Sequence, residues 1–182
     1  NGTIQPDHIW LEIFKKFKNT KINVSIDAYG DDNHYVRYPA KWKDILDTIE
    51  VIKANEIKFI INTVVSNLNI TFLDKLLLWI QKNNYLNYLY ILENPAHYSP
   101  TNLPDDCLEI TVSRLSKLPK KFKNQDTAGA VDRLIDMCNN TIVSDDKNNL
   151  LWNSFIKEVK MRDKQRGNCI VNVIPELGQF FN

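Results

Sequence analysis

Polar side chains with ligand-binding chemistry stand where an apolar segment of the chain ends, in Ser25-Ile26-Asp27. Alternate side chains of an extended strand share one face, so Ser25 and Asp27 are expected to point the same way. A hydroxyl beside a carboxylate can bind a ribose or an amino group. Asp27 is equally suited to a structural role, in which it begins the turn that contains Gly30. The residue types favour neither interpretation.

Two further apolar segments, 57–67 and 86–95, also end in polar residues. The first of them contains amides and hydroxyls at Asn62, Thr63, Ser66 and Asn67. Because a buried polar side chain without a partner is costly, these residues are expected either to contact a ligand or to cap the following helix. The second segment ends at Glu93-Asn94-Pro95.

The histidines and cysteines form no metal-binding or disulfide pattern. The three of each are widely separated, at His8, His34 and His97 and at Cys107, Cys138 and Cys169. Zinc sites and disulfide frameworks need regular spacings, so we expect isolated histidines and three reduced, partly buried thiols of a cytosolic protein. The sequence also lacks a glycine-rich phosphate loop and the common hydrolase and metalloprotease motifs.

Hydrophobic periodicity indicates the elements that position these residues. Strands are predicted for three apolar runs, at 21–27, 57–65 and 86–92. Helical spacing predicts a helix that begins near 104 and others over 7–18, 40–54, 72–80, 128–140 and 147–165. Asp7 is expected to cap the first helix. Residues 170–174 are expected to form a short strand or extended chain.

Strands that alternate with helices run parallel in one sheet, with their carboxyl ends at the same edge. The sequence therefore predicts an α/β fold whose ligand site lies at that edge. The net charge of +1 gives no attraction to nucleic acid or to an anionic membrane. No apolar run approaches the roughly 20 residues of a membrane span. A cytoplasmic protein without nucleic-acid or membrane partners is expected.

Several short motifs, in this order, resemble parts of radical S-adenosylmethionine enzymes. The run 24–30, Val-Ser-Ile-Asp-Ala-Tyr-Gly, followed by Arg37, is similar to the fourth strand and following loop of that family. The opening Asn1-Gly2-Thr3 is similar to the end of its third strand, and the run 62–69 to its fifth strand and turn. Leu92-Glu93-Asn94-Pro95 is similar to its sixth strand.

The end of the chain extends this resemblance. Asp163, Arg166 and Pro175-Glu176-Leu177 resemble the close of family members that carry an extra cluster domain of the twitch or SPASM type. The implied fold is a partial, TIM-like (β/α)6 barrel. Residues 1–100 would form the carboxyl-terminal half of this barrel, and residues 101–182 would form a helical extension packed on it.

The resemblance also implies an activity. Members of the family bind a 4Fe–4S cluster through a C-x3-C-x2-C loop and reductively cleave S-adenosylmethionine. The resulting 5′-deoxyadenosyl radical abstracts hydrogen from a substrate, here an unknown peptide or metabolite, and the electron comes from a donor such as flavodoxin or ferredoxin. This chain has no C-x3-C-x2-C, so the cluster ligands are expected upstream of Asn1, and the chain alone is expected to be inactive.

The resemblance assigns cofactor contacts to three residues near the first strand. Ser25 and Asp27 would face the ribose or the amino group of S-adenosylmethionine. Arg37 would pair with its carboxylate, since a guanidinium fork matches a carboxylate.

Further contacts are assigned to the other two strands. Asn62 and Thr63 would line the ribose side, and main chain near Leu92 and Glu93 would border the adenine. Two alternatives stay open. The chain could be a non-catalytic α/β half-barrel that binds a ligand or a partner, or a hydrolase or transferase, although no nucleophile–base pair is visible.

Overall fold

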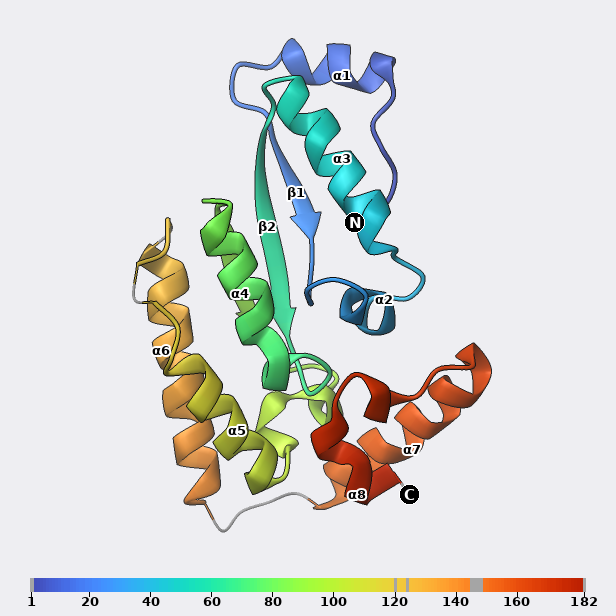
Figure 1. Cartoon of the computed structure of the whole chain (residues 1–182), viewed down its shortest axis with the longest axis vertical. Coiled ribbons are helices and arrows are strands. Elements are labelled where there is room, and N and C mark those ends of the chain that lie inside the picture. The colour runs from blue at the N-terminus through green and yellow to red at the C-terminus, as the bar shows by residue number, and fades with distance from the viewer. Residues whose placement is uncertain (1, 120, 124, 145–148, 182) are drawn as a thin grey trace.

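Three parallel strands form one sheet in the computed structural model of the chain (Figure 1), which describes residues 2–119, 121–123, 125–144 and 149–181. The strands are β1 (Lys21–Ser25), β2 (Lys58–Val65) and β3 (Asn87–Ile91), in the order β1-β2-β3. The predicted α/β fold with parallel strands is confirmed at this level. β1 ends earlier than predicted because the main-chain N–H of Asp27 is bound by a side chain outside the sheet.

Helices connect and follow the strands. Three predicted helical regions are occupied by α1 (His8–Lys15), α3 (Trp42–Ala54) and α4 (Leu73–Lys82). Asp7 caps α1 as predicted, since its Oδ1 accepts a hydrogen bond from Trp10 N at 3.0 Å. The other helices in the described ranges are α2 (Asp32–Val36), α5 (Asp105–Leu115), α6 (Gln125–Ile142), α7 (Asn149–Arg166) and α8 (Gly178–Phe181). Of these, α2 and α8 were not predicted. Residues 147 and 148 of the last predicted helix lie outside the described residues.

Short 3-10 turns complete the fold. They are η1 (Ile70–Phe72), η2 (Ala96–Tyr98), η3 (Pro100–Asn102), η4 (Ile170–Asn172) and η5 (Pro175–Leu177). The prediction of a strand or extended chain at 170–174 is wrong, because η4 occupies this segment. Ile174 N donates to Ile170 O at 2.7 Å, which is the contact of a tight turn.

The two faces of the sheet have different surroundings. Val24 and Ile61 point to one face and belong to a core that also contains the apolar residues of α3 and α4. The strand order has no reversal, so right-handed crossovers place α3 and α4 on the same side of the sheet. On the opposite face, Ser25 pairs in register with Asn62, and Asn62 with Tyr88. These three side chains are half-buried, outside the core.

The carboxyl ends of the strands point toward the carboxyl-terminal helices (Figure 1). Phe155 of α7 and Ile170 of η4 are fully buried in the same core as Val24 of β1. Segments on both sides of residue 100 therefore share one core. Helices from the end of the chain border the sheet edge at which the sequence predicts a site.

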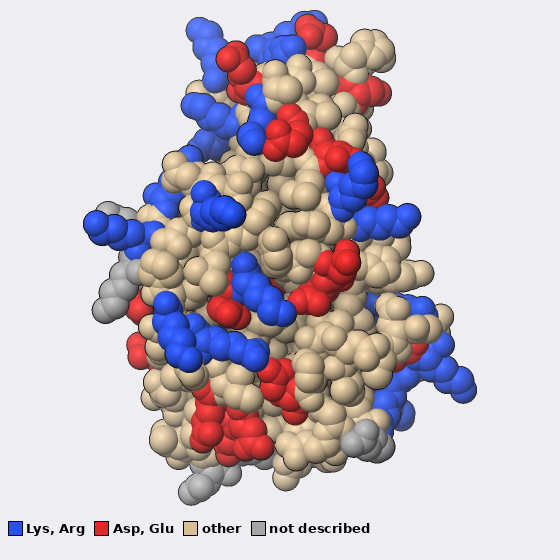
Figure 2. All heavy atoms as spheres, in the orientation of Figure 1, with Lys and Arg blue, Asp and Glu red and all other residues tan. Residues whose placement is uncertain are grey.

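Charges of both signs are interspersed over the face shown in Figure 2. Some of them pair, as in Lys53 Nζ with Glu50 Oε1 at 2.9 Å and Lys75 Nζ with Asp32 Oδ2 at 3.3 Å. Exposed pairs of this kind add little stability. In the described part of the chain, no helix combines the length and apolarity that crossing a membrane requires.

Candidate functional site

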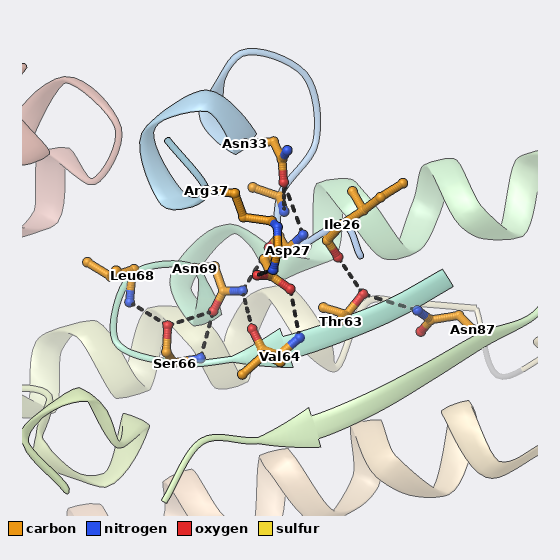
Figure 3. Close-up of polar contacts among 11 residues, drawn as sticks. Ile26, Asp27, Asn33, Arg37, Thr63, Val64, Ser66, Leu68, Asn69 and Asn87 are labelled. Carbon is orange, nitrogen blue, oxygen red and sulfur yellow. Dashed lines mark hydrogen bonds and ion pairs between the residues drawn. The ribbon is translucent and has the colours of Figure 1, made fainter. Parts of the chain in front are cut away.

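The carboxylate of Asp27 lies just beyond the end of β1 and is fixed from two directions (Figure 3). Its Oδ1 accepts a hydrogen bond from Val64 N on β2 at 2.8 Å. Its Oδ2 lies 2.7 Å from Nη1 of Arg37, in the loop after α2. The Asp27 side chain is 8% exposed and that of Arg37 is 26% exposed. Ion pairs that are largely shielded from water are much more sensitive to loss of one partner than surface pairs are.

Two asparagines hold the main chain of Asp27 after it leaves the strand ladder. Oδ1 of Asn33 accepts from the N–H of Asp27 at 3.0 Å and from that of Ala28 at 3.1 Å. Nδ2 of Asn69 donates to Asp27 O at 2.7 Å and to Val64 O at 2.8 Å. Both asparagines are fully buried. Because buried main-chain groups need partners, the two side chains replace the ladder where the sheet ends.

Asn69 belongs to a turn that is itself closed by side chains. Its Oδ1 accepts from Ser66 N at 2.7 Å, and Oγ of Ser66 accepts from Leu68 N at 3.2 Å. Asn67 instead reaches the loop after β3, where its Nδ2 donates to His97 O at 2.9 Å. The polar residues at the end of β2 thus bind neighbouring main chain. None of them makes a side-chain cap on α4.

A cavity of about 360 Å³ opens beside this network. Its lining residues are Thr3, Asp27, Val36, Arg37, Tyr38, Pro39 and Ala40. Both members of the Asp27–Arg37 pair therefore line the cavity. Asp27 engages one guanidinium nitrogen, and a guanidinium carries five N–H donors, so the group retains capacity to bind a second anion. This geometry fits a carboxylate ligand in the cavity.

The structure brings some of the predicted site residues together and separates others. Asp27 and Arg37 are in direct contact, while Ser25 and Asn62 are neighbours across β1 and β2 on the half-buried face. Thr63 is fully buried, and its Oγ1 donates to Ile26 O at 2.7 Å. Neighbouring strand residues point to opposite faces, so the Thr63 side chain lies on the core side and Asn62 on the other.

The two predicted residues after β3 lie farther along the same edge. Leu92 N donates to Val65 O at 2.8 Å, so its main chain continues the pairing with β2 by one bond. Glu93 is exposed. In the part of the chain that the structure describes, no hydrogen bond or ion pair joins either residue to the Asp27–Arg37 pair.

The cysteines and histidines remain apart in space. No group of three or more His, Cys, Asp and Glu side chains in the described ranges could hold a metal ion. Burial raises the pKa of the Cys107 thiol to about 12 and that of Cys138 to about 11. The third, Cys169, is exposed, which corrects the prediction that all three are partly buried. These residues do not fit the ligand set of a 4Fe–4S cluster.

Comparison of the chain with protein-family models, curated proteins and solved structures found no match in any of the three. The interpretation of the site therefore depends on its own geometry. Its central feature is the fixed Asp27–Arg37 pair at the edge of a cavity.

Proposed function

We propose that this chain is the carboxyl-terminal half of a radical S-adenosylmethionine barrel, and that it binds the carboxylate and ribose of the cofactor. The observation that carries the proposal is the guanidinium of Arg37, held 2.7 Å from Asp27 Oδ2 beside a cavity at the carboxyl end of β1. In α/β proteins that edge of the sheet binds ligands.

Arg37 is the residue that would receive the carboxylate of the methionyl group. Asp27 fixes one nitrogen of the guanidinium, while Val64 N fixes the other oxygen of Asp27. The arginine is therefore oriented before a ligand arrives, and less side-chain entropy is lost on binding. A carboxylate in the cavity would form charge-assisted hydrogen bonds with the remaining N–H groups.

The row formed by Ser25, Asn62 and Tyr88 supports the ribose assignment. These residues face away from the core and supply one amide and two hydroxyl groups side by side. Such groups can both donate to and accept from ribose hydroxyls. Thr63 would contribute indirectly, since its hydroxyl binds main chain on the opposite face.

The strand order also supports the barrel assignment. Consecutive units of a singly wound barrel would have the order β1-β2-β3 with both crossover helices on one face, as this sheet does. The polar row would then face the barrel interior, where the substrate, a peptide or a metabolite, meets the cofactor. A cluster held elsewhere in the protein would supply the electron from a donor such as flavodoxin or ferredoxin. The residues of this chain hold and orient the cofactor.

The coding frame upstream of Asn1 tests this proposal. We expect it to encode three βα units with a C-x3-C-x2-C loop after the first strand. A frame without any such motif would contradict the proposal. Replacement of Arg37 then tests whether this residue binds the cofactor. Replacement of Arg133, which is exposed on α6, is the control.

One observation favours a second candidate, a non-catalytic half-barrel that binds a ligand or a partner. Both carboxylate oxygens and both main-chain groups of Asp27 already have partners within the chain. The network is therefore stable without a cofactor. An intact protein that binds S-adenosylmethionine but never cleaves it under reducing conditions would support this candidate over the first.

A further inference from the structure

One face of α7 contacts the loops that follow two different strands. Glu158, Arg162 and Arg166 are spaced four residues apart on this helix, so their side chains project from the same face. Glu158 contacts the loop after β3, and the two arginines contact the segment after β1. A single helix thus links both ends of the sheet edge that carries the candidate site.

The contacts of α7 with the segment after β1 are made by two tyrosines close to Arg37 in the sequence. The hydroxyl of Tyr35 accepts a hydrogen bond from Nη2 of Arg162 at 2.9 Å and donates one to Oδ1 of Asp163 at 2.8 Å. The guanidinium of Arg166 lies 4.8 Å from the ring centroid of Tyr38. Tyr35 and Tyr38 stand on either side of Arg37 in the sequence.

Asp163 is itself fixed within the carboxyl-terminal region. Its Oδ2 accepts from Ile170 N of η4 at 2.7 Å. Arg162 also stacks on Tyr35, with its guanidinium carbon 5.0 Å from the ring centroid. The attachment of Tyr35 to α7 therefore combines two hydrogen bonds of the phenol with a cation–π contact on its ring.

Most of the cavity wall belongs to the segment that Tyr35 attaches to α7. Five of its seven lining residues are Val36 to Ala40, which follow Tyr35 directly. This segment is held by the Arg37–Asp27 pair and, separately, by the contacts of α7 with Tyr35 and Tyr38. Without the second attachment the segment could move while the ion pair opened and closed.

We propose that Arg162, Asp163 and Arg166 are positioning residues that fix the Arg37 segment, so that the carboxyl-terminal helical region sets the geometry of the cavity at the end of β1. The proposal gives a role to the Asp163 and Arg166 motif, which the cofactor assignment leaves unused. Only the identity of the ligand in this cavity rests on the proposed function.

The test compares two tyrosines that bind the same helix. Tyr35→Phe removes the hydroxyl that Arg162 and Asp163 share, while keeping the ring. Tyr98→Phe is the matched control, since the Tyr98 hydroxyl donates to Oε1 of Glu158 at 2.9 Å and Tyr98 belongs to η2, which follows β3 and not β1. The readout is hydrogen exchange at Nε of Arg37, measured by NMR on the folded chain.

We expect Tyr35→Phe to accelerate exchange at Arg37 Nε about tenfold, and Tyr98→Phe to change it less than about twofold, at similar losses of global stability. Equal exchange rates at Arg37 in the two variants would overturn the proposal, because α7 would then stabilise the fold without positioning the segment.

A second readout separates this proposal from the proposed function. In S-adenosylmethionine cleavage by the protein translated from the full reading frame, Tyr35→Phe should raise KM about tenfold and leave kcat unchanged. A fall in kcat with unchanged KM would contradict positioning of the carboxylate site. Absence of cleavage in the wild type would remove the proposed function, while the exchange rates would still decide the role of α7.

Discussion

The Nη1 atom of Arg37 lies 2.7 Å from Oδ2 of Asp27, and this contact closes the loop between the end of β1 and the start of α3. The same carboxylate accepts from Val64 N of β2, so one side chain joins two strands and a loop. An arginine that would otherwise be mobile in solvent is thereby held at the edge of a cavity.

Replacing the carboxylate of Asp27 should destabilise the fold. In Asp27→Asn the charge that balances Arg37 is lost, and the new NH2 group must face one of two donors, the guanidinium of Arg37 or the N–H of Val64. We expect the free energy of unfolding to fall by about 2–4 kcal/mol, as for other shielded pairs that lose one partner. Urea unfolding measures this loss. The control is Asp47→Asn, whose exposed pair with Lys43 should matter little. Equal losses in the two variants would show that the Asp27–Arg37 pair contributes no more to stability than an exposed pair does.

Asn69 should be at least as important as Asp27 for stability. Asn69→Ala removes hydrogen bonds to the main chain of Asp27, Val64 and Ser66, all in a buried turn. We expect a loss of about 2–4 kcal/mol in the free energy of unfolding, because these main-chain groups would stay buried without partners. Asn55→Ala is the control, since Asn55 makes one side-chain bond to Val51 O near the end of α3. A smaller loss of stability for Asn69→Ala than for Asn55→Ala would contradict the stabilising role of the hydrogen bonds of Asn69.

The three cysteines should differ in reactivity. Cys107 and Cys138 are fully buried, and burial raises the pKa of their thiols to about 12 and about 11, so the thiolate is scarce at neutral pH. Cys169 is exposed. We expect a thiol reagent such as Ellman's reagent to modify Cys169 rapidly in the native protein and the other two only after unfolding. Rapid release of more than one thiolate equivalent from the folded chain would contradict the packing of α5 and α6.

Stability in acid should depend on Glu158. Burial tends to raise the pKa of this carboxyl, but the hydrogen bonds from Tyr98 and His97 outweigh burial and lower it below its ordinary value of 4.5. A carboxyl with a lowered pKa stabilises the fold above that ordinary value, and its contribution is lost as the pH falls through the folded-state pKa.

Glu158→Gln should therefore lower the melting temperature at neutral pH by about 2 °C, since the side chain is 43% exposed and its contacts are screened. The difference from wild type should shrink as the pH falls below the ordinary pKa of 4.5. Thermal melts at a series of pH values measure it. If the difference in melting temperature grew as the pH fell, the pKa of Glu158 would be raised in the folded state, which would contradict the hydrogen bonds from Tyr98 and His97.

The sequence predicted the strands more completely than it predicted the Asp27–Arg37 pair. Apolar β-branched runs such as 57–65 are strong signals, so the order of strands and main helices followed from periodicity. Asp27 and Arg37 were both identified as site residues, but their direct contact was not predicted. It depends on α2, a five-residue polar helix that has no apolar period to reveal it.

The asparagines of the network were missed because of what they bind. Asn33 and Asn69 contact main-chain atoms of distant segments, and sequence patterns carry no information on which main chain lies nearby. Turn residues around Gly30 indicate that Asn33 could bind its local backbone, and this is the only signal available. The contacts of α7 with Tyr35 join residues 127 and 128 positions apart, beyond the reach of any local pattern.

Formation of 5′-deoxyadenosine is the direct test of whether this chain belongs to a radical S-adenosylmethionine enzyme. The protein translated from the full reading frame, reconstituted anaerobically with iron and sulfide and reduced with dithionite, is incubated with S-adenosylmethionine. Our account predicts 5′-deoxyadenosine from the wild type and from Arg133→Ala, and a rise in KM of at least about tenfold in Arg37→Ala, which lacks the carboxylate partner. No 5′-deoxyadenosine from a folded, cluster-loaded wild type, or an unchanged KM in Arg37→Ala, would contradict it.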